Sequence, residues 1–199
     1  MTKRKIIQGI FAVIFLLLVI LGTIQIWLGI FIATLLLTPF YGRLYCGYVC
    51  PINTLTEATR PLARKKKWPV PRWLKHPAVR IGFLLLMVVV MATTMRAGKP
   101  LPILPLLSAL GVLLSLFYEE ALWHRYLCPY GTLLSLPGKL TTKGYTVDPA
   151  TCIGCRKCQQ VCPSDAITMV DKKAVINLSE CLVCGSCAAV CPVKAIEIK

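Results

Sequence analysis

Long apolar runs separated by short polar segments dominate the first two thirds of the chain. The first run covers residues 6–41 and contains no charged side chain. As a single helix it would be about 54 Å long, whereas the hydrocarbon core of a bilayer is about 30 Å thick. Gly22, Thr23 and Gln25 supply a turn near its middle. The pattern therefore predicts two short transmembrane helices, at residues 6–21 and 26–41.

Two more apolar runs follow, at residues 78–95 and 101–123, and the second is most uniformly apolar from Pro105 onward. A polar turn at residues 96–100 separates them. Buried helices of a soluble protein are the alternative, which the length of the runs and their lack of charge disfavour. Residues 1–138 are therefore predicted to form an all-α membrane domain of four transmembrane helices, with Trp68, Trp73 and Trp123 in the aromatic belt at the lipid–water interface.

The charge distribution predicts how these helices are oriented. The chain carries 23 Lys and Arg against 8 Asp and Glu. Three basic residues precede the first helix, and the loop at 42–80 is strongly basic. Of the two loops at the opposite membrane face, the first contains no basic residue and the second contains two, Arg96 and Lys99. The positive-inside rule then predicts a multi-pass protein of the cytoplasmic membrane, with the N terminus, the 42–80 loop and everything after the fourth helix in the cytoplasm. The loop's basic residues are Arg43, Arg60, Arg64, Lys65, Lys66, Lys67, Arg72, Lys75 and Arg80.

This basic loop also bears on the class of partner. Basic runs occur in nucleic-acid-binding proteins, but a run placed between two membrane helices is better suited to anionic lipid headgroups. We therefore expect lipid contacts and no nucleic-acid partner. Only 16% of the residues are charged and 56% are hydrophobic, with a mean hydropathy of +0.68, which excludes disordered and collagen-like classes.

After Lys139 the composition changes, and residues 139–199 contain an internal repeat with an offset of 29 residues. Each copy reads C-x2-C-x2-C-x3-C-P, the spacing of bacterial two-cluster ferredoxins. Three closely spaced thiolates can hold three corners of a [4Fe-4S] cluster, and the other repeat supplies the fourth. The predicted ligands are Cys152, Cys155, Cys158 and Cys191 for cluster one, and Cys181, Cys184, Cys187 and Cys162 for cluster two.

Zinc and disulfides are the alternatives for these eight cysteines. Zinc ribbons use two separated C-x2-C pairs rather than a duplicated four-cysteine run, and disulfides are rare in the reducing cytoplasm. Residue 147 and the segments 167–170, 174–178 and 196–198 are typical of short strands. The second domain is therefore expected to have the small α+β fold of two-cluster ferredoxins.

Three cysteines remain, and they follow the second and fourth predicted helices at the same predicted membrane face. The sequence YCGYVCPINTL, which starts at Tyr45, aligns with WHRYLCPYGTL, which starts at Trp123, so that His124 takes the place of Cys46. Cys46, Cys50, Cys128 and His124 are therefore candidate ligands of a third metal centre, in which imidazole would replace one thiolate. Alternatively, the cysteines are small apolar residues that cap helix ends, and His124 is an ordinary structural residue.

Residues 42–56 and 123–136, together with the cysteine repeat that follows, resemble the NapH-type membrane ferredoxins of periplasmic nitrate reduction. Related membrane modules occur in NosR-type accessory proteins and in MauN-like proteins. The resemblance implies a chain that passes electrons between the quinol pool, or partner subunits, and redox enzymes. The sequence departs from the family pattern at His124 and in its very short loop between the first two helices, so a role in nitrate reduction does not follow.

Three functions fit these features. The first is an electron-transfer subunit, which needs redox partner subunits because no catalytic residues, nucleotide motif or flavin motif are evident. Whether the chain is itself an enzyme stays open. The second is part of a quinone oxidoreductase, with Glu57, Glu119, Glu120 and His124 at the depth where a quinone would bind. The third is an accessory or regulatory protein that supplies electrons for the maturation of a metalloenzyme.

Overall fold

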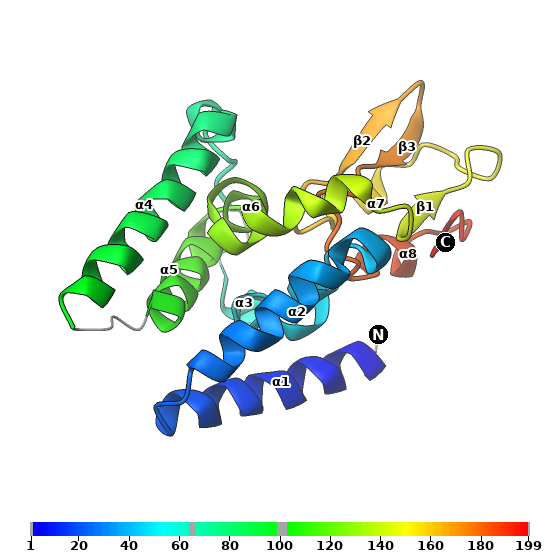
Figure 1. Cartoon of the computed structure of the whole chain (residues 1–199). Coiled ribbons are helices and arrows are strands. Elements are labelled where there is room, and N and C mark those ends of the chain that lie inside the picture. Colours follow the sequence, from blue (N-terminus) through cyan, green and yellow to red (C-terminus); the bar gives the residue numbers. More distant parts are fainter. Residues whose placement is uncertain (1, 64–66, 99–102, 199) are drawn as a thin grey trace.

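The computed structural model describes residues 2–63, 67–98 and 103–198, and its elements are labelled in Figure 1. Arg64, Lys65, Lys66, Lys99 and the predicted start of the fourth helix at residue 101 lie outside the described residues. Four long helices are present in the described part: α1 (Thr2–Ile20), α2 (Gln25–Tyr41), α4 (Pro77–Arg96) and α5 (Ile103–Phe117). The α1–α2 turn lies far from the C-terminal strands, as does the end of α4 that leads toward α5 (Figure 1).

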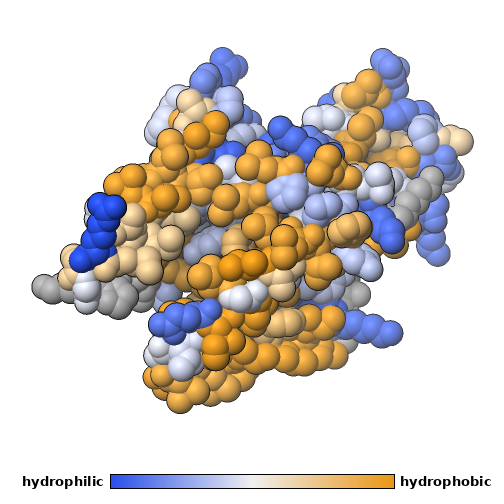
Figure 2. All heavy atoms as spheres, in the orientation of Figure 1, coloured by the Kyte–Doolittle hydropathy of each residue, from blue (hydrophilic) through white to orange (hydrophobic). Residues whose placement is uncertain are grey.

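Among the described residues, α4 is the one helix that is long and apolar enough to cross a membrane by length and composition, and α2 and α5 are shorter apolar helices. No residue of α4 is buried. Large apolar side chains are also exposed on α1, α2 and α5, and Figure 2 shows them as a broad hydrophobic surface over the helices. A patch of this extent needs a covering of lipid or of another protein.

The fourth apolar run forms a shorter helix than predicted. Helix α5 ends at Phe117 because the backbone of Trp68 pairs with the chain there: the Trp68 N–H donates to Phe117 O (2.9 Å), and the Glu119 N–H donates to Trp68 O (3.1 Å). The expectation of one continuous helix to residue 123 is therefore wrong: the helix is interrupted after Phe117, and a π-helical turn begins at Leu122. Trp123 is 1% exposed, so it lies in the protein core and not at a lipid interface.

Each helical hairpin is followed by the same local structure. A π-helical turn, a cysteine and a short helix that begins with proline follow α2 and again follow α5, as η1 (Tyr45–Val49) and α3 (Pro51–Ala58), then η4 (Leu122–Leu127) and α6 (Pro129–Ser135). The backbone hydrogen bonds agree: Cys50 N–H donates to Tyr45 O (2.7 Å) and Cys128 N–H donates to Trp123 O (2.8 Å). Proline suits the first helical position because its fixed φ fits the helix and no N–H is needed there.

The connecting segments add three single 3₁₀ turns, η2 (Arg60–Leu62), η3 (Arg72–Lys75) and η5 (Pro137–Leu140). In the C-terminal part, β1 (Tyr145–Val147) pairs antiparallel with β4 (Ile196–Ile198), and β2 (Ile167–Val170) pairs antiparallel with β3 (Lys173–Ile176). Short helices α7 (Lys157–Gln160) and α8 (Ser186–Ala189) each contain the third cysteine of a repeat. The expected small α+β fold is therefore present, with the third strand shifted toward the N terminus.

Candidate iron–sulfur sites

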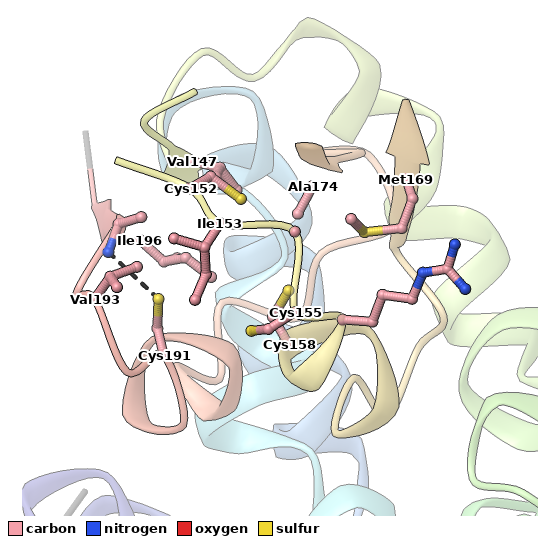
Figure 3. A pocket seen from close by; sticks show the side chains of 13 residues that line it. Val147, Cys152, Ile153, Cys155, Cys158, Met169, Ala174, Cys191, Val193 and Ile196 are labelled. Atoms are coloured by element: carbon pink, nitrogen blue, oxygen red, sulfur yellow. Dashed lines mark hydrogen bonds between the residues drawn. The ribbon is translucent and has the colours of Figure 1, made fainter. Parts of the chain in front are cut away.

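Two cavities in the C-terminal part are lined by the duplicated cysteines. Cys152, Cys155 and Cys158 of the first repeat and Cys191 of the second line one cavity, which Figure 3 shows together with its apolar wall. Apolar side chains, among them Val147, Met169 and Ala174, line the cavity together with these cysteines. The structure thus brings three cysteines of one repeat and the fourth cysteine of the other to one site.

The second cavity repeats this arrangement with the roles of the repeats exchanged. Cys181, Cys184 and Cys187 line it together with Cys162. The fourth cysteine of each repeat is held in the same way: the Ala195 N–H donates to Cys191 Sγ (3.3 Å; Figure 3), and the Ala166 N–H donates to Cys162 Sγ (3.3 Å). Hydrogen bonds to a cluster's sulfur ligands stabilise their negative charge and help to set its potential.

The first ligand loop of each repeat passes through the left-handed region at two matching positions. Gly154 has φ of 72° and Val183, 29 residues later, has φ of 54°; Arg156 and Gly185 have φ of 62° and 75°. At Gly154 an added Cβ would lie 2.2 Å from Lys172 O, so only glycine fits there. These turns direct the thiols of a loop inward toward the cavity.

The thiols fit a polynuclear cluster better than a single metal ion. In the part of the chain that the structure describes, no group of three or more His, Cys, Asp or Glu side chains converges on a point where one ion would be held. Zinc needs its four ligands at one centre, whereas each thiolate of a [4Fe-4S] cluster binds a different iron. Four thiols that line one cavity could each bind a different iron of such a cluster.

The protonation of these thiols depends on their surroundings. Hydrogen bonds from the backbone of Ala174 and Gly154 lower the pKa of the Cys152 thiol. Burial raises the pKa of Cys181 to about 11 and that of Cys187 to about 12, and the neighbouring cysteines add to the rise at Cys187. Because thiols must lose their protons to ligate metal, binding at the second cavity releases protons that the apoprotein holds firmly.

The second cavity lies against the helical part of the molecule. Glu180, directly before Cys181, accepts hydrogen bonds from Arg43 (2.9 Å) and Arg80 (2.7 Å). Gly47 packs so closely on the loop that an added Cβ would lie 2.2 Å from Leu182 O. The loop that carries Cys181 is therefore docked on η1, whereas Cys155 of the first cavity is exposed.

The remaining three cysteines are buried next to this docking surface. Cys46, Cys50 and Cys128 are 6%, 6% and 5% exposed, and each lies close enough to another of the three to influence its ionisation. Burial raises the pKa of all three thiols, that of Cys128 to about 12. Arg43 Nη2 lies 3.9 Å from Cys46 Sγ.

His124 is buried, but its ring is turned to other partners. Its Nε2 atom lies 3.4 Å from Thr56 Oγ1. Burial lowers the pKa of His124 to about 4, with Glu120 opposing and Arg43 reinforcing this effect. The imidazole is therefore neutral at physiological pH. The structure thus brings the three cysteines together. The neighbours of His124 are Thr56 and charged side chains such as Glu120.

The carboxylates expected near a quinone are engaged in ion pairs. Glu57 pairs with Arg4 (2.7 Å), and Glu120 pairs with Arg60 (2.6 Å) and Lys67 (3.2 Å). Glu119 and Glu120 nevertheless line an open cleft of about 1030 Å³, open solvent included, between the basic loop and the C-terminal part. Cys162, a thiol of the second cavity, lines the opposite wall.

Sequence reasoning did not identify Arg43, Arg80, Glu180 or Gln8 as parts of these sites. The two arginines were counted only as orienting charges, and Gln8, whose side chain donates to Gly47 O (3.0 Å), lies inside an apolar run. Glu180 did carry a signal: it is one of only eight acidic residues, and it precedes a ligand loop where the other repeat has Thr151.

Comparisons with known proteins agree with this geometry. A family model described as a 4Fe-4S binding domain matches residues 23–71 and 101–144, which include the three buried cysteines, and a 4Fe-4S dicluster domain model matches residues 145–192. The ferredoxin-type protein MauN of Methylobacillus flagellatus is 30% identical over 66% of this chain and 53% of its own length. NapH of Escherichia coli, also named a ferredoxin-type protein, is 27% identical over 68% of this chain and 52% of its own length.

A third relative, the regulatory protein NosR of Pseudomonas aeruginosa, is 27% identical over 64% of this chain and 21% of its own length. The chain therefore spans about half the length of the MauN and NapH relatives, and less of NosR. The segments that the two family models match include both Cys-Pro turns and both cysteine repeats. With iron–sulfur models covering the helical and the C-terminal part, the chain belongs to the NapH/MauN-like family of ferredoxin-type proteins.

Proposed function

We propose that this protein is a membrane-anchored electron-transfer subunit that carries one [4Fe-4S] cluster in each cavity of its C-terminal domain. The observation that supports this most strongly is that each cavity is lined by four cysteines, three from one repeat and the fourth from the other. A bound cluster of this kind takes up and releases one electron. The surrounding apolar side chains and backbone N–H groups hold the thiolates and keep water away.

The two sites differ in their surroundings, and this difference suggests the order of a relay. Cys155 and Ile153 of the first cavity are exposed, and the basic residues Arg156 and Lys157 follow Cys155 in the sequence. The second cavity is docked on η1 and the buried Arg43. Cluster one would therefore exchange electrons with a separate redox protein, and cluster two would exchange them with the helical domain.

The membrane arrangement is part of the proposal. We place α1, α2, α4 and α5 as four spans of the cytoplasmic membrane, with residues 1–138 as the membrane domain and 139–199 as the cytoplasmic ferredoxin domain. The exposed apolar surface of these helices supports it, as does the gathering of the N terminus, the basic loop and the ferredoxin domain at the same end of the molecule (Figure 1). The loop at 42–80 would contact anionic headgroups.

A quinone is the second reactant that the geometry accommodates. The cleft between Glu119 and Cys162 connects the predicted headgroup level with a thiol of cluster two. Its polar wall suits a quinone headgroup, which needs hydrogen-bond partners. Because Glu120 is held by Arg60 and Lys67, Glu119 is the more accessible candidate for proton exchange.

An accessory role is the alternative function, and the similarity to a relative named as a regulatory protein favours it. The two functions differ in the partner that each requires. A catalytic redox subunit that remains bound in equal amount after mild detergent extraction supports the electron-transfer subunit. A partner that is bound only while its metal site is being assembled supports the accessory role.

Removal of single ligands tests the proposal for the two C-terminal clusters. The full chain is purified without oxygen, and its iron, sulfide and electron paramagnetic resonance spectrum are measured. We expect Cys155→Ser to remove the signal of cluster one and Cys184→Ser that of cluster two, each with about four irons lost per chain. A colourless wild-type protein, or one that contains zinc in place of iron and sulfide, would refute the proposal.

A further inference from the structure

At the docking surface, one carboxylate serves two guanidinium groups, of which one is fully buried. The Arg43 side chain is 0% exposed and that of Arg80 is 16% exposed, and both donate hydrogen bonds to the one carboxylate of Glu180. Two guanidinium groups thus share a single negative charge. An arginine cannot lose its proton in a protein, and a buried charge is costly unless an opposite charge pairs with it. Solvent reaches the partly exposed Arg80, whereas the fully buried Arg43 shares its one carboxylate with Arg80.

The side of the Arg43 guanidinium that has no carboxylate partner faces the buried cysteines. Its Nη1 atom is used by Glu180 and by Ser179 O, whereas Nη2 lies 3.9 Å from Cys46 Sγ, a long contact. The Nε atom, also buried, has no hydrogen-bond partner among the described residues. Gly131 makes room for the guanidinium, since an added Cβ there would lie 2.6 Å from Arg43 Nη2.

Three protonated thiols supply no charge, but three thiolates on iron do. Thiolates are soft ligands that select iron–sulfur clusters, zinc or copper(I). The family model that spans these three cysteines is described as a 4Fe-4S binding domain. Helix-capping cysteines alone would leave the Nη2 and Nε atoms of Arg43 without an anionic partner.

We propose that Cys46, Cys50 and Cys128 hold a third iron–sulfur cluster, and that Arg43 is the positioning residue whose charge balances it. The inference rests on the proposed function and extends it. We take the three thiols as the protein ligands and leave out His124, whose Nε2 atom lies 3.4 Å from Thr56 Oγ1. The fourth coordination position of the cluster is therefore open or filled by a small exogenous ligand.

The third cluster would connect the ferredoxin domain to the membrane domain. Arg43 contacts Cys46 on one side and Glu180, the neighbour of the cluster-two ligand Cys181, on the other. One electron would leave cluster two and arrive at the third cluster, with no bond made or broken and no proton moved. A nearby cation favours the reduced and more negative state, so Arg43 raises the midpoint potential of this cluster.

Metal content and spectroscopy test the site. We expect the oxygen-free wild-type chain to contain about twelve irons with matching sulfide, and Cys128→Ala to contain about eight. The variant should lose one paramagnetic signal and retain those of clusters one and two. A wild-type value of about eight irons with both ferredoxin signals present would refute the third cluster and leave the proposed function intact. One zinc per chain, lost in Cys128→Ala, would also refute it.

Two matched arginine variants test the role of Arg43 without removing a ligand. Arg43→Gln and Arg80→Gln each remove one guanidinium from Glu180, but only Arg43 contacts a buried thiol. We expect Arg43→Gln to lower the midpoint potential of the third cluster in a redox titration, Arg43→Lys to restore most of it, and Arg80→Gln to change it much less. Equal shifts in both glutamine variants would overturn the assignment to Arg43.

Iron content and spectroscopy also test whether His124 is a ligand. If the three cysteines are the protein ligands, His124→Gln retains the iron content, and the spectrum of the third cluster keeps its shape. Loss of about four irons in that variant would identify the imidazole as a ligand and overturn the three-thiolate site.

Discussion

Individual residues in the ligand loops show how two copies of one motif can differ. Gly154 and Val183 occupy equivalent positions, and both have a left-handed backbone. Valine is rarely found in this conformation because its branched side chain crowds the backbone. The second repeat nevertheless accommodates it: Val183 is buried, and it lies where a side chain on Gly42 would meet it at 3.3 Å. The first repeat has no such freedom, because Lys172 O lies directly over Gly154.

The first cavity should therefore depend on Gly154. We expect Gly154→Ala to cost about 1–3 kcal/mol in the stability of the ferredoxin domain through backbone strain and to reduce the occupancy of cluster one. Iron content and the paramagnetic signal of cluster one measure the effect. Gly82→Ala is the control, because an added Cβ there meets nothing within 4 Å. Equal cluster occupancy in both variants would contradict this explanation.

At the same scale, the sequence revealed the cysteines but not their charged neighbours. A duplicated cysteine spacing has few chemical explanations, so the ligand candidates could be named before their positions were known. Arg43 could not, because a basic residue after a membrane helix satisfies the positive-inside rule whatever it contacts. Its pairing with Glu180, 137 positions later, depends on how the domains dock.

Among the elements, α5 illustrates what an apolar run can and cannot predict. Its existence follows from hydrophobicity, whereas its end is set by the backbone of Trp68 from another segment. The same helix packs on η4 at Gly111, where an added Cβ would lie 2.8 Å from the Trp123 ring and 2.9 Å from Ile52. Burial of Trp123 and the early end of α5 are thus tertiary effects, which a local pattern does not encode.

The close packing at Gly111 yields a prediction for the helical domain. Gly111→Ala should destabilise it by about 1–3 kcal/mol, because a methyl group has to displace a buried ring and a buried isoleucine. Thermal unfolding followed by tryptophan fluorescence in detergent measures this. Gly29→Ala in α2, where an added Cβ meets nothing within 4 Å, should unfold at or above the wild-type temperature. A similar loss of thermal stability in both variants would mean that the close packing at Gly111 does not cause the effect.

For the whole molecule, the central feature is how few polar contacts join its two parts. Glu180 receives the buried Arg43 and the partly exposed Arg80 at one side of the ferredoxin domain. Asp165 supplies a second contact at the other side, where Arg125 donates to its carbonyl and Tyr126 Oη donates to its carboxylate (3.2 Å). The first is buried and the second is partly exposed, so they should differ greatly in strength.

Removal of each carboxylate charge compares the two contacts. We expect Glu180→Gln to weaken docking by about 3–5 kcal/mol, because it leaves the buried Arg43 without its carboxylate partner. Hydrogen exchange of the backbone at residues 178–184 and 43–49 should then speed up. The partner of Asp165, Arg125, is 27% exposed. Asp165→Asn should therefore change the free energy of docking, as measured by hydrogen exchange, by less than about 1 kcal/mol. Equal protection in the two variants would show that packing alone holds the domains together.

Helix α4 has a consequence of another kind. Its contacts with the rest of the protein are concentrated near its first turns, where Arg80 meets Gly131 and Phe83 meets Trp123, and none of its residues is buried. In the membrane that we propose, its far half is surrounded by acyl chains alone. The inclination of this helix should then follow the thickness of the bilayer, so that lipids of different chain length would tilt α4 while the cysteine-bearing end of the protein stays fixed.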